Sequence, residues 1–238
     1  MNATLITLTA RALLGRRRVW LLVPIPVLLL GMALLGMLSP VPAEDWSPGL
    51  LSGLGIAVLL PLTALIVGSS ALGLEIEDGT ITHILTKPVP RYEIIIAKLI
   101  VAWGVTVLAA ALPIGLAAVI VAGTAAGLGV FIACVVGALA YTAIFLALSL
   151  VTRRPVAFGL VYIMLWENLL TRFVDGARIL SIKDYVTAIG QRLAGSGLLE
   201  PATLAPLTGV ILAVLIASAA TVAATARLRA FALTGETA

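Results

Sequence analysis

The sequence predicts an all-α polytopic membrane protein with six transmembrane helices, and three observations support this fold class. Apolar residues make up 61% of the 238 residues and charged residues only 11%, whereas a soluble domain carries about 25% charged residues. Six apolar runs alternate with short polar segments. Lysine and arginine are concentrated in alternate segments. We therefore expect a single transmembrane domain over residues 1–238.

The six apolar runs define the expected spans. They cover approximately residues 19–38, 50–73, 99–122, 128–151, 156–171 and 203–226. Each run is long enough to cross a membrane as a helix, although the fifth is short. The backbone must satisfy its own hydrogen bonds in hydrocarbon, which requires helices here. The first run is longer than the roughly 7–15 apolar residues of a signal peptide, so we expect it to be retained.

The positive charges predict the orientation. With the N-terminus in the cytoplasm, eleven of the 15 lysines and arginines lie on the inner side. The four on the outer side are Arg172, Arg178, Lys183 and Arg192. This bias follows the positive-inside rule and places both termini in the cytoplasm. The excess of arginine over lysine, with abundant Ala, Leu and Gly, indicates a GC-rich bacterial genome and hence the bacterial cytoplasmic membrane.

An interfacial helix is expected at the N-terminus. Residues 2–14 place Thr4, Thr7 and Arg11 on one stripe and apolar side chains on the other, and three arginines follow. This pattern is typical of a helix that lies on the inner leaflet. The alternative is a plain cytoplasmic extension of the first span.

A short outer amphipathic helix is expected between spans 5 and 6. Ser181 and Asp184 have the spacing of a capping box. Apolar residues then recur on one face, namely Ile182, Tyr185, Val186, Ile189 and Leu193. Gly195 and Gly197 end the helix. We expect this helix to lie on, or partly in, the outer leaflet.

The inner segment between spans 2 and 3 predicts a second short helix. Asp78, Gly79 and Thr80 form a helix start, and Pro88 and Pro90 end the helix about two turns later. Its apolar face consists of Ile81, Ile84 and Leu85. So short a helix cannot bury that face on itself, so it needs either the membrane surface or a partner protein.

The same segment resembles a known family signature. Glu-x-Glu-x-Gly-Thr, a following Lys-Pro-x-x-Arg and a lysine at the start of the next span look like the motif of type-2 ABC transporter permeases, the membrane subunits of ABC exporters. The matching residues are Glu75, Glu77, Gly79, Thr80, Leu85, Pro88, Arg91 and Lys98. The family architecture also resembles the predicted one, with an interfacial N-terminal helix, six spans and short helices between spans 5 and 6.

The resemblance implies a function for the inner segment. Residues 75–91 would be a coupling helix that docks on a separate ABC ATPase subunit. The residues implied in coupling are Glu75, Glu77, Asp78, Gly79, Thr80, Ile81, His83, Ile84, Leu85, Lys87, Pro88 and Arg91. The chain has no phosphate loop, so it is not expected to be an enzyme. ATP and Mg are expected on the partner, with no cofactor or metal bound by this chain.

The resemblance also implies export through a path formed by a dimer, with a second copy or a homologous permease as partner. Gly53, Gly55, Ala57 and Gly104 could allow close helix contact, but the sequence does not assign their face. Membrane lipid is a further expected partner, and nucleic acid is not. Tyr92 and Lys98 are interpreted as interface anchors of span 3.

Three other function classes compete with a permease. An intramembrane hydrolase is disfavoured because the only histidine, His83, lies in an inner loop and the aspartates lie outside the spans. An anchor or sensor subunit with no transport role is the second class. The third is an ion-coupled secondary carrier or channel that uses Glu167, beside Asn168 in span 5. Glu167 is either an outer carboxylate, hydrated or paired with Arg172, or part of a gate or substrate path.

Overall fold

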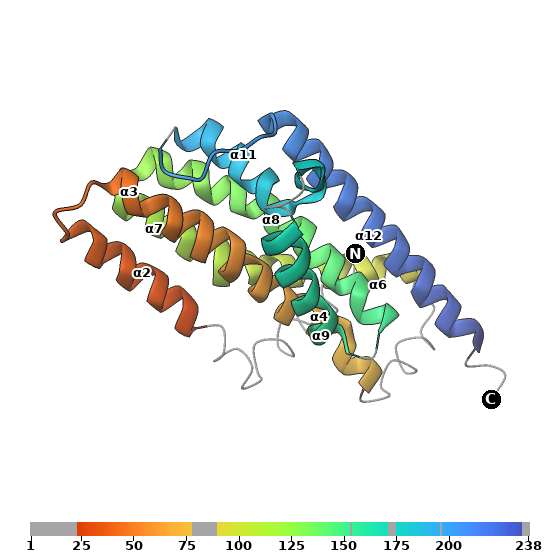
Figure 1. Cartoon of the computed structure of the whole chain (residues 1–238). Helices are drawn as coiled ribbons and strands as arrows, with labels where there is room; N and C mark the ends of the chain where they lie inside the picture. Colours follow the sequence, from red (N-terminus) through yellow and green to blue (C-terminus); the bar gives the residue numbers. More distant parts are fainter. Residues whose placement is uncertain (1–22, 78–89, 153, 171–174, 196, 235–238) are drawn as a thin grey trace.

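The protein is a bundle of long helices (Figure 1). The computed structural model describes residues 23–77, 90–152, 154–170, 175–195 and 197–234, which contain helices and no strand. Among these described residues, four helices are long and apolar enough to cross a membrane: Ala43–Leu72, Arg91–Ala122, Thr124–Val151 and Pro206–Arg229. Pro24–Met37 and Pro155–Glu167 are shorter apolar helices. The all-helical membrane class is confirmed, whereas the count of six spans stays a prediction. The expected helix at residues 2–14 lies outside the described residues.

The described helices follow the predicted order with shifted boundaries. In chain order they are α2 (Pro24–Met37), α3 (Ala43–Pro48), η2 (Gly49–Leu59), α4 (Leu60–Glu77), α6 (Arg91–Thr106), η3 (Val107–Ala111), α7 (Leu112–Ala122), α8 (Thr124–Val151), α9 (Pro155–Val161), η4 (Tyr162–Leu170), η5 (Asp175–Leu180), α11 (Ile182–Ala194) and α12 (Pro206–Thr234). The third apolar helix begins at Arg91 rather than residue 99, and the last at Pro206 rather than residue 203.

Prolines account for two π-helical segments, η2 and η3. Each segment ends two residues before a proline, Pro61 or Pro113. A proline has no N–H, and its ring clashes with the carbonyl four residues earlier. The backbone widens instead: the Leu60 N–H donates to the Gly55 carbonyl and the Leu112 N–H donates to the Val107 carbonyl, both five residues back. The long helices therefore continue past their prolines.

The bundle has two ends, which we name by their elements. The α11 end contains α3, the α7–α8 turn at Gly123 and the C-terminus of α11 (Figure 1). The α4–α6 end contains the C-terminus of α4 and the N-termini of α6 and α9. Gly123 adopts φ 86°, a left-handed conformation that lets α8 reverse directly after α7.

Helix α8 forms the centre of the core and packs against α4, α7, α11 and α12. Tyr141 and Phe145 are buried along it and their rings stack with centroids 6.1 Å apart. Polar bonds join α8 to α6: the Trp103 indole N–H donates to the Val135 carbonyl at 3.0 Å, and the Thr142 hydroxyl lies 3.4 Å from that of Thr106. The other helices are therefore placed relative to α8.

The small residues of the second and third predicted spans have different surroundings. Gly55 faces Ile114, since an added Cβ would lie 3.3 Å from that side chain, and Ala57 is buried. These two are therefore used within the chain and are not available to a second copy. Gly53 and Gly104 have open space where a Cβ would lie.

Candidate functional site

Helix α11 begins and ends as its sequence predicts. Ser181 is the N-cap and its hydroxyl accepts a hydrogen bond from the Asp184 N–H at 3.3 Å. Gly195 follows the last residue with φ 94°. This confirms the helix and its boundaries. Its apolar face is covered by protein, because Ile182, Tyr185 and Val186 have no exposed surface. Helix α11 packs against α8 and α12 at the edge of the bundle (Figure 1), and its depth in the outer leaflet stays a prediction.

Small residues on α8 allow α11 to lie this close. A Cβ on Gly129 would lie 2.7 Å from the backbone carbon of Leu193, and one on Gly137 would overlap Val186. Between them, Ala133 faces Gly190. Residue numbers fall on α11 as they rise on α8, so the two helices are antiparallel. The N-terminus of α11 therefore lies beside the middle of α8, and its C-terminus beside the start of α8.

Glu167 caps this interior N-terminus from another helix. It lies in η4 and is only 1% exposed. One carboxylate oxygen accepts from the Ser181 hydroxyl at 2.6 Å, and the other from the Ile182 N–H at 3.0 Å. The Lys183 N–H adds a longer bond of 3.4 Å. The interpretation of Glu167 as a hydrated surface carboxylate is therefore wrong. Arg172 and the side chain of Asn168 lie outside the described residues.

The π-helical backbone of η4 brings a fourth donor to the carboxylate. The Tyr162 hydroxyl donates to Glu167 at 3.2 Å, although the two residues are five apart. In an α-helix the neighbours on one face are three or four apart, and the wider π-helix shifts this spacing toward five. The buried Tyr141 hydroxyl interacts with Glu167 electrostatically. The Trp166 indole N–H donates to the Leu180 carbonyl at 3.4 Å, which holds η4 to η5.

The electrostatics of this cluster suit a carboxylate. The first N–H groups of a helix have no partner within it and carry its positive dipole end. A carboxylate has only acceptors, so it satisfies several of these donors at once.

In the first turn of α11, burial raises the pKa of the Asp184 carboxyl despite Arg178 and Lys183, which lower it. Burial and the charge of Glu167 raise the pKa of Tyr185 to about 12, so this hydroxyl stays a donor, to the Ile179 carbonyl.

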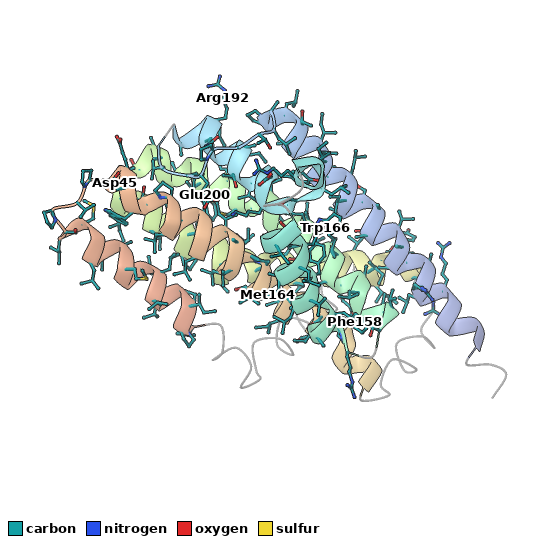
Figure 2. All side chains as sticks on the ribbon, viewed as in Figure 1. Asp45, Phe158, Met164, Trp166, Arg192 and Glu200 are labelled. Carbon is teal, nitrogen blue, oxygen red and sulfur yellow. The ribbon has the colours of Figure 1, made fainter. Side chains whose placement is uncertain are left out.

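The C-terminal half of α11 is tied to the loop that precedes α12. The Gln191 side chain donates to the Glu200 carbonyl at 2.6 Å and accepts from the Ala202 N–H at 3.1 Å. The Glu200 N–H donates to the Ser52 hydroxyl of η2 at 3.0 Å. Figure 2 shows Arg192 and Glu200 at this α11 end, with Asp45, and Phe158 far from them. Polar groups at the α11 end therefore connect α11, the loop before α12 and η2.

The predicted coupling residues fall at the α4–α6 end. Glu75 and Glu77 belong to the last turns of α4, and Arg91 is the first residue of α6. The side chains of Glu75 and Glu77 are outside the described part of the chain. So is the whole of Asp78, Gly79, Thr80, Ile81, His83, Ile84, Leu85, Lys87 and Pro88. The structure therefore gives the two helices that flank the coupling segment, and its docking role stays a prediction.

Lys98 joins these two flanking helices. It is 4% exposed, and its ammonium donates to the Ala71 carbonyl of α4 at 2.8 Å. The interpretation of Lys98 as an interface anchor is therefore wrong. A buried ammonium requires hydrogen-bond partners, and α4 supplies one from its backbone. Tyr92, the other expected anchor, is 47% exposed.

An apolar cavity of about 330 Å³ lies between α2 and the α3–η2 helix. Its lining consists of Leu28, Met32, Trp46, Gly49, Leu50 and Leu54. The Trp46 indole N–H is buried with no hydrogen-bond partner among the described residues. The described residues also contain no group of three His, Cys, Asp or Glu side chains that could hold a metal ion.

Sequence reasoning missed two parts of this site. Tyr162 and the three donors on α11 could not be linked to Glu167, because the donors lie 14 to 16 residues further along the chain. The groove on α8 did leave a signal. Gly129, Ala133 and Gly137 repeat every four residues, which is the pattern of a close helix contact in membranes.

Comparison with known proteins assigns the chain to a family. A family model described as ABC-2 family transporter protein matches residues 6–221. A search of curated proteins finds no match. The matched region contains α2 to α11, the α4–α6 end and the Glu167 cluster, so the family covers both parts of the site. The chain therefore belongs to the ABC-2 transporter family, as a multi-pass membrane permease subunit.

Proposed function

We propose that this chain is the permease of an ATP-driven exporter, that it forms the transport path as a dimer, and that residues 75–91 couple it to a separate ABC ATPase. Permeases of this family pair with an ABC ATPase subunit. The α4–α6 end then faces the cytoplasm of a bacterial cell, and the α11 end faces outside. The bias of eleven positive residues against four supports this orientation.

The observation that carries the proposal is the hydrogen-bonded contact between α4 and α6, which we call the α4–α6 joint. These helices flank the predicted coupling segment directly, from Glu77 to Arg91. The bond from Lys98 to the Ala71 carbonyl joins them within the bundle. A force applied to the segment would therefore displace both helices together. Helix α4 also packs along α8, the centre of the core, so the displacement would reach the rest of the permease.

The geometry of Glu167 favours this function over an ion-coupled carrier. A coupling carboxylate has to bind and release its ion during each cycle. Both oxygens of Glu167 are already engaged by donors from η4 and α11. This arrangement supports an anchoring role. Secondary transport therefore has no specific support from the described residues.

The experiment compares two substitutions at one position of the coupling segment. Thr82→Pro introduces a helix-breaking residue, at a local cost of up to roughly 3 kcal/mol, whereas Thr82→Ala keeps the predicted helix. Each permease is purified together with its partner ABC ATPase. We expect Thr82→Pro to insert normally but to retain little ATPase or to leave ATP hydrolysis unstimulated. Thr82→Ala should match the wild type. Wild-type retention and stimulation with Thr82→Pro would refute the proposal.

A further inference from the structure

The N-terminus of α11 depends on a carboxylate that another helix supplies. The Ser181 hydroxyl and the Ile182 N–H both donate to Glu167, and all three residues are at most 1% exposed. No water can replace a missing acceptor in so buried a place without entering the bundle. The position of α11 along α8 is therefore linked to the position of η4.

A continuous helical rod leads from the α4–α6 end to this carboxylate. It consists of α9 and η4, which run from Pro155 to Leu170 without a break. The first part of the rod packs closely against α4, because a Cβ on Gly159 would overlap the Leu65 side chain. Helix α4 is the one that ends at the coupling segment. A movement of α4 would therefore reach Glu167 through packed contacts rather than through a loop.

We propose that Glu167 is the positioning residue that holds α11 against α8 in the resting permease, and that movement of the α9–η4 rod during the ATPase cycle releases it. This inference rests on the proposed function. The surface that α11 would leave is shallow, since Gly129, Ala133 and Gly137 present little side chain to it. The hydrogen bonds to Glu167 thus attach the N-terminus of α11 to the α9–η4 rod. The hydrogen bond from the Ala202 N–H to the Gln191 side chain would hold the other end of α11 in place while the N-terminus moves.

A cysteine buried in α11 reports the two states. The reporter is Thr187→Cys. Thr187 is 2% exposed, and cysteine is close to threonine in size. The only native cysteine, Cys134, is replaced by alanine. The permease is purified with its ATPase and reacted with a bulky, water-soluble maleimide, first without nucleotide and then with ATP and Mg. The same measurement is made with Glu167→Gln, which keeps the size of the side chain, and with Glu167→Ala.

Asp184→Asn is the matched control. It is also an acid-to-amide change in the first turn of α11, but its side chain lies outside the Glu167 hydrogen bonds. ATPase retention and a monodisperse elution profile show that each variant is assembled. If Glu167→Ala does not assemble, Glu167→Gln alone decides the result.

The inference predicts a specific pattern of labelling rates. With Glu167 present, labelling at position 187 should be slow without nucleotide and at least about tenfold faster with ATP, since local opening exposes a buried residue. Glu167→Gln should label fast in both conditions, because the amide loses acceptors for the helix N-terminus. Asp184→Asn should label no faster than the wild type without nucleotide. Equal rates for Glu167→Gln and wild type, or no effect of ATP during active hydrolysis, would overturn the inference. Failure of the wild type to retain the ATPase would instead overturn the proposed function.

Discussion

Glu167 and Lys98 are both charged side chains that are almost fully buried, and each binds the backbone of a different helix. Glu167 of η4 accepts from the start of α11, and Lys98 of α6 donates to the carbonyl of Ala71 in α4. Buried charges are stable only when such partners satisfy them. Each therefore fixes a contact between two helices, at opposite ends of the proposed route of movement.

Removing the ammonium of Lys98 should weaken the joint between α4 and α6. Lys98→Met keeps the apolar stem but leaves the Ala71 carbonyl without this donor, at a cost of about 1–3 kcal/mol. Thermal unfolding of the purified permease should show a clearly lowered midpoint, with less stimulation of the ATPase. Lys183→Met is the control, because it breaks an ion pair with Glu200, which is 45% exposed, and such pairs contribute about 1 kcal/mol or less. An unchanged midpoint for Lys98→Met would contradict the role of Lys98.

Asp184 should make the stability of α11 depend on pH. Burial raises the pKa of its carboxyl in the folded protein, so the folded state binds the proton more tightly than the unfolded chain. Stability is then highest below the ordinary aspartate pKa and falls as pH rises through the folded value. Asp184→Asn should therefore unfold at a higher temperature than wild type at neutral pH, and the difference should shrink toward about pH 4. Melting curves at several pH values test this, and a variant less stable at neutral pH would contradict it.

At the scale of elements, local chemistry predicted α11 but not its place. Ser181 and Gly195 set its two ends, and these signals act within a few residues. Its apolar face was compatible with either a leaflet or a protein groove. The groove is formed by Gly129 and Gly137, about 50 residues earlier in the chain, and single-helix periodicity does not pair distant faces. The π-helical segment at Glu167 was also beyond prediction, because no proline marks it.

The fit of α11 on α8 should be sensitive to a single methyl group. At Gly129 an added Cβ would lie 2.7 Å from backbone of Leu193, which cannot move like a side chain. Gly129→Ala should destabilise the permease by about 1–3 kcal/mol through overpacking. Gly31→Ala, in α2, is the control because it meets nothing within 4 Å, and alanine favours a helix. Thermal unfolding compares the two. Equal midpoints would show that α11 is not fitted to α8 in this way.

For the whole molecule, composition and apolar runs were sufficient to predict an all-helical membrane protein. They could not give the contacts between helices, since lipid-facing and protein-facing residues are equally apolar in such a bundle. Leu35 of α2 is 68% exposed and Leu51 of η2 is fully buried, yet the two residues are chemically alike. The buried polar side chains are easier to single out in the sequence, but their hydrogen-bond partners come from distant parts of the chain and depend on the fold.

The proposed orientation predicts which ends of the bundle are reached from each side of the membrane. In a Cys134→Ala background, cysteines at exposed positions Asp45 and Arg192 should react with an impermeant maleimide in intact cells (Figure 2). A cysteine at Arg229, near the end of α12, should react only after the membrane is permeabilised. Labelling of position 229 in intact cells would reverse the orientation.

The most direct test of the central claim, that the ATPase docks on the coupling segment of residues 75–91, is site-specific photo-crosslinking in intact membranes. A photoreactive phenylalanine analogue is placed at His83 in one permease and at Arg192, at the α11 end, in another. After irradiation, the covalent product is identified with an antibody against the ATPase. We expect a permease–ATPase product from position 83 and none from position 192. A product from position 192, or none from position 83 while the two proteins still co-purify, would contradict it.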